Sequence, residues 1–88
     1  MAWKIEYLSA SRRQLKRLDP EIRARILEYM REWIDEGDSP YSSGQALTGK
    51  WIGHWRYRVD DYRVICKIQD ERLVVMVVKA GHRGDVYN

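Results

Sequence analysis

Two alternating segments on either side of Asp60–Asp61 constrain the fold more than any other feature of the sequence. Trp55–Val59 and Tyr62–Gln69 each place apolar residues at every second position, which is the pattern of a β-strand with one buried face. Two residues are enough to connect antiparallel strands. We therefore predict a β-hairpin with its turn at Asp60–Asp61.

The rest of the chain predicts a small two-layer domain. Trp3–Tyr7 alternates like a strand, and Arg12–Leu18 fits a short helix. Pro20 begins a longer helix, whose apolar residues recur at spacings of three and four: Ile22, Ile26, Leu27, Met30, Trp33 and Ile34. Leu73–Val78 is apolar at every position, like a strand covered on both faces. We predict one α+β domain over residues 1–88, a four-stranded antiparallel sheet with a helical hairpin on one face (β-α-α-β-β-β).

The two-residue turn also fixes which side chains share a face. Arg58 then lies opposite Arg63, and Arg56 joins them on the same face. The helices cover the other face, where we expect core residues: Trp55, Tyr57, Val59, Tyr62, Val64 and Cys66. Like charges paired across strands destabilise a sheet by roughly 0.2–1 kcal/mol. A sequence that keeps such a pair is more plausibly holding a site for phosphate, which is the interpretation we favour. Alternatively, the arginines spread into water, where the repulsion is screened.

The last strand and the tail extend this face in the predicted arrangement. A two-residue turn at Asp70–Glu71 pairs Arg63 with Val78 and puts His82 on the face of the arginines. A three-residue turn would reverse the side on which His82 lies. Arg83 and Tyr87 follow in a polar tail that can fold back over the same face.

The charge distribution favours a polyanionic partner. Lys and Arg total 16 against 13 Asp and Glu, a net charge of +3. Residues 1–44 carry eight charges of each sign, so the whole excess lies in residues 45–88. Arginine, which binds phosphate with two parallel hydrogen bonds, supplies 11 of the 16 cations.

Other features exclude several classes of protein. The single cysteine, Cys66, allows no internal disulfide and no cysteine-based zinc site, and is expected to be a small core residue. No apolar run approaches the ~20 residues of a membrane span. Met1–Glu6 contains no signal-peptide hydrophobic region. We therefore expect a cytoplasmic protein.

Two further groups are candidate RNA contacts. A dense basic cluster on the first helix either touches ribosomal RNA, which we favour, or keeps the protein soluble; it consists of Arg12, Arg13, Lys16 and Arg17. Trp51 precedes the hairpin and either stacks on a base or covers the sheet edge. Trp33 is expected in the core because it lies in the helical stripe.

Several segments together resemble the RelE/ParE superfamily of bacterial toxins. They are Leu47-Thr48-Gly49, Tyr62-Arg63-Val64-Ile65 and the ending Gly81-His82-Arg83-Gly84-Asp85-Val86-Tyr87. The resemblance covers nearly the whole chain and points to the RelE branch. It implies a toxin of a type II toxin–antitoxin system, a ribosome-dependent endoribonuclease (mRNA interferase) that cleaves mRNA in the ribosomal A site and inhibits translation. It also implies as partners a cognate antitoxin, the ribosome with its rRNA, and mRNA. DNA would be contacted only through the antitoxin complex, and no membrane is involved.

The resemblance also implies roles for individual residues. Arg56 and Arg58 match a pair of basic residues that are lysines in the best-known members, and Arg63 matches a strand arginine. Arg83 matches the general acid and Tyr87 the general base of a 2′-hydroxyl attack on the adjacent phosphate. No metal ion or cofactor is expected. Unperturbed tyrosine has a pKa near 10, but clustered guanidinium groups favour the phenolate and stabilise the phosphorane. His82 is an alternative proton donor or a residue that orients RNA.

Two other functions compete with the nuclease. The first is a ParE-like toxin that inhibits DNA gyrase without nuclease activity. The second is a non-catalytic nucleic-acid-binding module. The site of Arg56, Arg58, Arg63, Arg83 and Tyr87 distinguishes the nuclease from the gyrase inhibitor, which has no reason to keep these residues. Tyr87 distinguishes it from the binding module, for which removal of the hydroxyl is nearly neutral.

Overall fold

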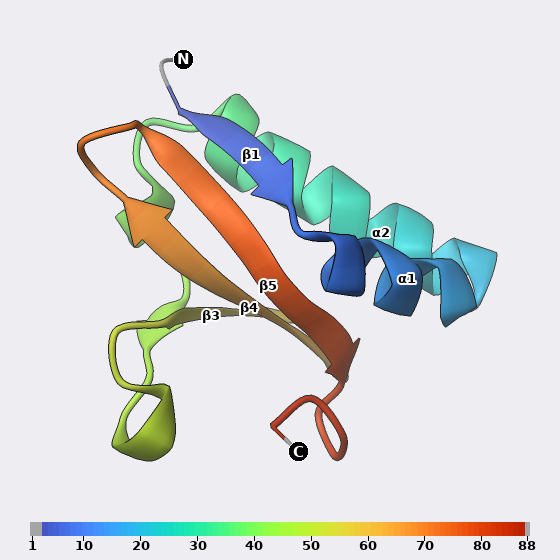
Figure 1. The fold of residues 1–88 in the computed structure, drawn as a ribbon. Helices are drawn as coiled ribbons and strands as arrows, with labels where there is room; N and C mark the ends of the chain where they lie inside the picture. The colour runs from blue at the N-terminus through green and yellow to red at the C-terminus, as the bar shows by residue number, and fades with distance from the viewer. Residues whose placement is uncertain (1–2, 88) are drawn as a thin grey trace.

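The computed structural model describes residues 3–87, which form one five-stranded sheet with two α-helices on one of its faces (Figure 1). Met1, Ala2 and Asn88 lie outside the described residues, so the segment considered for a signal peptide is described only from Trp3. The elements are β1 (Lys4–Tyr7), α1 (Ser9–Arg17), α2 (Pro20–Met30), η1 (Arg31–Asp35), η2 (Pro40–Ser42), β2 (Gln45–Ala46), η3 (Gly49–Trp51), β3 (Trp55–Val59), β4 (Tyr62–Gln69) and β5 (Val74–His82). The predicted two-layer α+β fold is confirmed.

The predicted sheet was wrong in the direction of its first strand and in its strand number. The strand order is β1-β5-β4-β3-β2, and β1 runs parallel to β5, with Lys4 opposite Val74 and Tyr7 opposite Val77. Alternation is the same in parallel and antiparallel strands, so the sequence pattern carries no direction. A long connection is what permits parallel pairing, and here it contains both helices. The fifth strand, β2, has two residues and is too short to produce an alternating pattern.

The β3–β4 hairpin has the predicted register. Arg58 lies opposite Arg63, and Trp55 lies opposite Cys66. Asp60 adopts a left-handed conformation (φ 54°) in the turn, which aspartate tolerates better than most residues. The carboxylate of Asp60 also forms an ion pair with Arg25, which ties the turn to α2.

The β4–β5 pairing differs from the prediction in two ways. The turn spans four residues, 70–73, because Gln69 pairs with Val74. The two additional residues of the turn leave every side chain of β5 on its predicted face. The second difference is a β-bulge opposite Ile65 and Cys66, which changes the faces: Cys66 pairs with Val77 and Ile65 with Lys79, so Val78 is the extra residue. One extra residue in the strand reverses the faces of all residues that follow it.

The core lies between the helices and the sheet. Its fully buried side chains come from both layers: Ile26, Met30, Ile34, Tyr57, Val64, Cys66, Val75 and Val77. The expected core positions of Tyr57, Trp55 and Tyr62 are confirmed, the last two at the core margin. Trp33 was expected inside but is 42% exposed. It lies in the π-helical turn η1, which is wider than an α-helical turn and keeps Ile34, not Trp33, on the buried stripe.

None of the helices within residues 3–87 is long and apolar enough to cross a membrane.

Candidate active site on the face of the sheet opposite the helices

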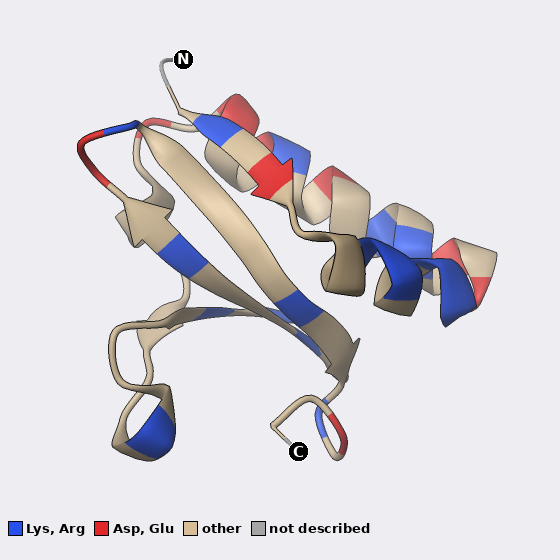
Figure 2. Ribbon diagram, viewed as in Figure 1, with Lys and Arg blue, Asp and Glu red and all other residues tan. Residues whose placement is uncertain are grey.

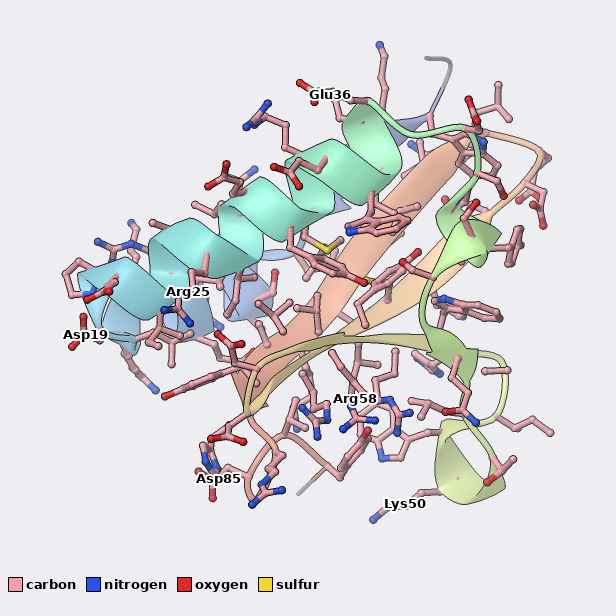
Figure 3. All side chains as sticks on the ribbon, turned by 180° about the vertical axis from the view of Figure 1, so that it is seen from behind. Asp19, Arg25, Glu36, Lys50, Arg58 and Asp85 are labelled. Carbon is pink, nitrogen blue, oxygen red and sulfur yellow. The ribbon has the colours of Figure 1, made fainter. Side chains whose placement is uncertain are left out.

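Three arginines project from the sheet face that the helices leave bare. Arg56 and Arg58 on β3 and Arg63 on β4 share this face, which we call the arginine face. In Figure 3 the labelled Arg58 points away from α2, into the space between β3, the loop with Lys50 and the C-terminal segment with Asp85. The sequence therefore predicted this cluster with its register.

The arginines are held differently. The Arg63 side chain is 8% exposed, and its Nη1 group donates to the carbonyl oxygens of Asp60 (3.0 Å) and Tyr62 (2.9 Å). The Nη2 group of Arg56 donates to Oε1 of Gln45 (2.6 Å), whereas its Nε is buried without a hydrogen-bond partner among residues 3–87. Arg58 is exposed to solvent. Arg63 is therefore a fixed charge, and Arg58 is free to meet a ligand.

The electrostatics of the cluster favour an anion. Burial lowers the pKa of Arg63, and the neighbouring charges of Arg58, Arg56 and, more weakly, Arg83 lower it further. No carboxylate within residues 3–87 forms an ion pair with Arg56, Arg58 or Arg63. A phosphate on this face would remove the repulsion that the fold leaves unrelieved.

The C-terminal segment folds back beside the hairpin turn. The amide groups of Asp85 and Val86 donate to the carbonyl oxygen of His82 (2.9 and 3.0 Å), and Val86 is 3% exposed. The amide of Arg83 donates to the carbonyl oxygen of Asp61 (2.9 Å), and its Nε lies 4.0 Å from the Asp61 carboxylate. These contacts place Arg83 at the end of the β3–β4 hairpin.

Tyr87 reaches the arginine face through this fold of the tail. Tyr87 is one of the groups that act on the pKa of Arg63, in the direction of raising it. The Tyr87 hydroxyl is buried and finds no hydrogen-bond partner in the described part of the chain. Leaving a buried polar group unpaired costs about 1–3 kcal/mol. Folded proteins therefore rarely keep such a group unless it serves a ligand or catalysis.

Trp51 lies within this site. Its ring packs edge-on against Tyr87, with centroids 6.4 Å apart, and against His54 at 5.3 Å. The Nζ atom of Lys79 lies 5.5 Å from the centroid of the Trp51 ring. The indole nitrogen of Trp51 is buried with no partner within residues 3–87. In this structure Trp51 covers protein side chains, and its stacking on an RNA base stays a prediction.

The expectation that His82 lies on the arginine face was wrong. His82 pairs with Tyr62, and the two rings meet edge-on at 5.5 Å on the helical side of the sheet. The bulge in β5 is the reason, since it reverses the side on which His82 projects. The Nδ1 atom of His82 accepts a hydrogen bond from the Gly84 amide (3.2 Å). His82 also lines a cavity of about 550 Å³ beside Gln14 and Arg17.

The bulge brings Lys79 to the arginine face, a residue that the sequence analysis missed. It stands opposite Ile65, on the same side as Arg63 and Arg56. Because Leu73–Val78 is apolar at every position, the sequence offers no alternation from which a bulge can be detected.

The basic cluster of α1 does not join this site. Its four side chains are exposed on α1, in the helical layer (Figure 2): Arg12, Arg13, Lys16 and Arg17. The α1 cluster and the arginine face therefore form two separate basic surfaces on opposite sides of the sheet. An RNA contact by α1 remains a prediction.

Among residues 3–87, no three His, Cys, Asp or Glu side chains gather where they could hold a metal ion. The chemistry available on the arginine face is that of guanidinium, ammonium and phenol groups.

The two-layer fold with this cationic sheet face is the arrangement that the resemblance to the RelE/ParE superfamily of toxins implies, and comparison with known proteins confirms the superfamily. Residues 5–87 match the family model for the ParE toxin of the type II toxin–antitoxin system parDE, so the chain belongs to this family of toxins. Toxin RelG of Mycobacterium tuberculosis is 29% identical over 87 residues, which cover 99% of this chain and 98% of RelG.

Solved structures share the fold of this chain. The toxin–antitoxin complex RelBE2 of Mycobacterium tuberculosis matches with a TM-score of 0.79 and 26% identity, over 96% of this chain and 94% of the matched chain. The isolated RelE toxin of E. coli matches with a TM-score of 0.69 and 14% identity, over 92% and 84% of the two chains. RelE from the RelE–RelB complex of Pyrococcus horikoshii matches with a TM-score of 0.67 and 22% identity, over 98% and 100%.

Proposed function

We propose that this toxin, as a single domain over residues 1–88, is a ribosome-dependent endoribonuclease that cleaves mRNA in the A site and so inhibits translation. The observation that carries the proposal is the arginine face itself. Arg56, Arg58 and Arg63 lie together without a paired carboxylate in the described chain, and the tail folds Tyr87 toward them. Such an arrangement suits a phosphodiester that gains negative charge in the transition state.

In the proposed reaction, the 2′-hydroxyl of one nucleotide attacks the adjacent phosphorus. Tyr87, as phenolate, takes the 2′-hydroxyl proton, and the new bond forms as the bond to the 5′-oxygen breaks. Arg56, Arg58 and Arg63 bind the non-bridging oxygens and stabilise the phosphorane. The products are a 2′,3′-cyclic phosphate and a 5′-hydroxyl, and each proton transfer in this scheme is assigned to a protein side chain.

We assign the proton delivered to the leaving 5′-oxygen to Arg83. The alternative donor, His82, projects on the other side of the sheet, against Tyr62. Arg83 lies beside Asp61 at the end of the hairpin and is exposed. Because the Tyr87 hydroxyl is buried in this structure, the groups that cover it must move aside when RNA binds, which suits a site completed on the ribosome.

The proposed partners are a cognate antitoxin, the ribosome and its mRNA. One of the matched structures, RelBE2, is a toxin–antitoxin complex, and another is the RelE–RelB complex of Pyrococcus horikoshii. Their similarity to this chain supports an antitoxin as its partner. DNA would be reached only through that complex, no membrane takes part, and the site of action would be the cytoplasm, where ribosomes translate.

The family model supplies a second candidate function. It describes the ParE toxin of parDE systems, so we keep a gyrase-inhibiting toxin without nuclease activity as the alternative. The target of such a toxin would be a protein surface. This alternative does not explain why Arg56, Arg58 and Arg63 lie together, because it supplies no phosphate for them to bind.

Primer extension on translated mRNA tests the two functions against each other. We expect wild-type toxin to produce cuts in phase with codons and only on active ribosomes. Tyr87→Phe and Arg83→Ala should each remove most of the cleavage and leave ribosome binding largely intact. Arg31→Ala, on the helical side, serves as the control and should cleave like wild type. Unchanged cleavage in both site variants would refute the assignment, and topoisomerase-linked DNA breaks would favour the alternative.

A further inference from the structure

Lys79 is brought to the arginine face by an irregularity of the backbone. In a regular ladder the residue opposite Ile65 would be Val78, but the bulge makes it Lys79. Bulges are over-represented beside active sites, where they redirect a side chain. Here the redirected side chain is a cation, in a strand that is otherwise apolar from Val74 to Val78.

Lys79 then meets the ring against which Tyr87 packs. Its Nζ atom lies 5.5 Å from the Trp51 centroid, within the range of a cation–π interaction. The Trp51 ring meets Tyr87 edge-on at 6.4 Å. Because the Tyr87 hydroxyl has no hydrogen-bond partner in residues 3–87, contacts of its ring, and not a polar bond, fix its orientation in this structure.

We propose that Lys79 is a positioning residue, which fixes the Trp51 ring and through it holds Tyr87 over the arginine face. The inference rests on the proposed nuclease function and adds Lys79 and Trp51 to its machinery. Trp51 acts in this arrangement as a support for the Tyr87 ring. Lys79 acts through Trp51 and needs no contact with the reacting atoms.

Single-turnover cleavage of ribosome-bound mRNA measures the contribution of Lys79. We expect Lys79→Met to slow cleavage about tenfold, which corresponds to about 1.4 kcal/mol and lies between the strengths of exposed and desolvated cation–π contacts, as suits the half-buried Lys79. Lys79→Arg, which keeps the cation, should cleave within about twofold of wild type. Lys67→Met is the matched control, because Lys67 is a lysine on the same face of the sheet but is exposed and pairs with Met76, beyond the bulge.

A double-mutant cycle separates positioning from direct RNA binding. If Lys79 acts through Tyr87, Lys79→Met should cause no further loss in a Tyr87→Phe background, which lacks the hydroxyl that must be positioned. A further loss of about tenfold in that background would mean that Lys79 binds RNA independently, and would overturn the inference.

NMR of the free toxin supplies a readout that needs no cleavage. We expect the Tyr87 ring resonances to shift in Lys79→Met and in Trp51→Leu, and to stay in place in Lys67→Met. Unshifted Tyr87 resonances in Lys79→Met would overturn the inference even if wild type cleaves normally. Failure of the wild-type toxin to cleave mRNA would overturn the proposed function together with the role of Lys79. This result can be told apart from a failure of the Lys79 inference alone, in which wild type cleaves normally.

Discussion

Arg58 and Arg63 face each other across β3 and β4, although a sequence selected for stability alone would avoid this pair. Arg63 is fixed by two backbone carbonyl groups, so it cannot turn away from Arg58. The fold therefore keeps a local repulsion at the place where the proposed substrate binds. Strain of this kind is common at functional sites.

Removing one of the two charges should stabilise the free protein. We expect Arg58→Gln to raise the free energy of unfolding by roughly 0.2–1 kcal/mol at low ionic strength, and to reduce mRNA cleavage. The gain should disappear in about 1 M salt, where charges are screened beyond ~3 Å. Urea denaturation measures it. Arg72→Gln, which breaks the ion pair with Glu6, should show no gain, and a loss in Arg58→Gln would contradict the repulsion.

Tyr7 gives a pH dependence of known sign. Burial, and then the nearby Cys66 thiol, raise the pKa of Tyr7 to about 12. Burial also raises the pKa values of Tyr57 and Cys66. The fold thus prefers neutral groups, so their contribution to stability is complete below the unfolded-state pKa and is lost as the pH rises through the folded-state pKa.

We therefore expect the free energy of unfolding to fall between about pH 10 and pH 12, the interval between the ordinary pKa of tyrosine and the raised pKa of Tyr7. Tyr7→Phe should flatten part of this fall and leave the stability near pH 7 almost unchanged. Urea denaturation at several pH values measures both curves. Parallel curves for the variant and wild type would show that Tyr7 does not contribute.

Among the elements, the register of the strands was predictable where alternation is strict and was not predictable where alternation is absent. Trp55–Val59 and Tyr62–Gln69 alternate around a two-residue turn, so their register, and with it the cluster of Arg56, Arg58 and Arg63, followed from the sequence. Leu73–Val78 has no alternation, so the bulge that moves Lys79 to this face and His82 away from it was invisible. The direction of β1 depends on the path of the helices, which a local pattern does not contain.

The C-terminal segment depends on one apolar anchor. Val86 is buried, whereas Asp85 on one side of it is exposed and Tyr87 on the other is half-buried. We expect Val86→Ala to destabilise the fold by about 1–2 kcal/mol and to reduce cleavage more strongly, because it releases the segment that carries Arg83 and Tyr87. Hydrogen exchange at the Asp85 and Val86 amides, which bond to His82, should become faster. Unchanged exchange would show that the backbone bonds alone hold the tail.

For the molecule as a whole, the two basic surfaces lie on opposite sides of the sheet. The arginine face carries the proposed chemistry, and the α1 cluster lies in the helical layer (Figure 2). The proposed site of action, inside a ribosome, would surround the protein with RNA, so the second surface fits a docking role that is separate from cleavage.

Neutralising the α1 cluster should therefore affect binding and not chemistry. We expect replacement of Arg12, Arg13, Lys16 and Arg17 by glutamine to weaken ribosome binding and to lower the slope of log K against log salt, by up to about 0.9 for each phosphate that the cluster no longer neutralises. The single-turnover rate of the bound complex should stay the same. Binding that is unaltered at every salt concentration would leave solubility as the role of the cluster.

The turn between β3 and β4 has a consequence for communication across the sheet. Asp60 is bound by Arg25 from α2, and its neighbour Asp61 accepts the amide of Arg83. Two adjacent aspartates thus connect the outer surface of the helical layer to the segment that carries the proposed acid and base. A protein that covers α2 and takes Arg25 from Asp60 would therefore act on the turn that holds Arg83, from the side of the sheet opposite the arginine face.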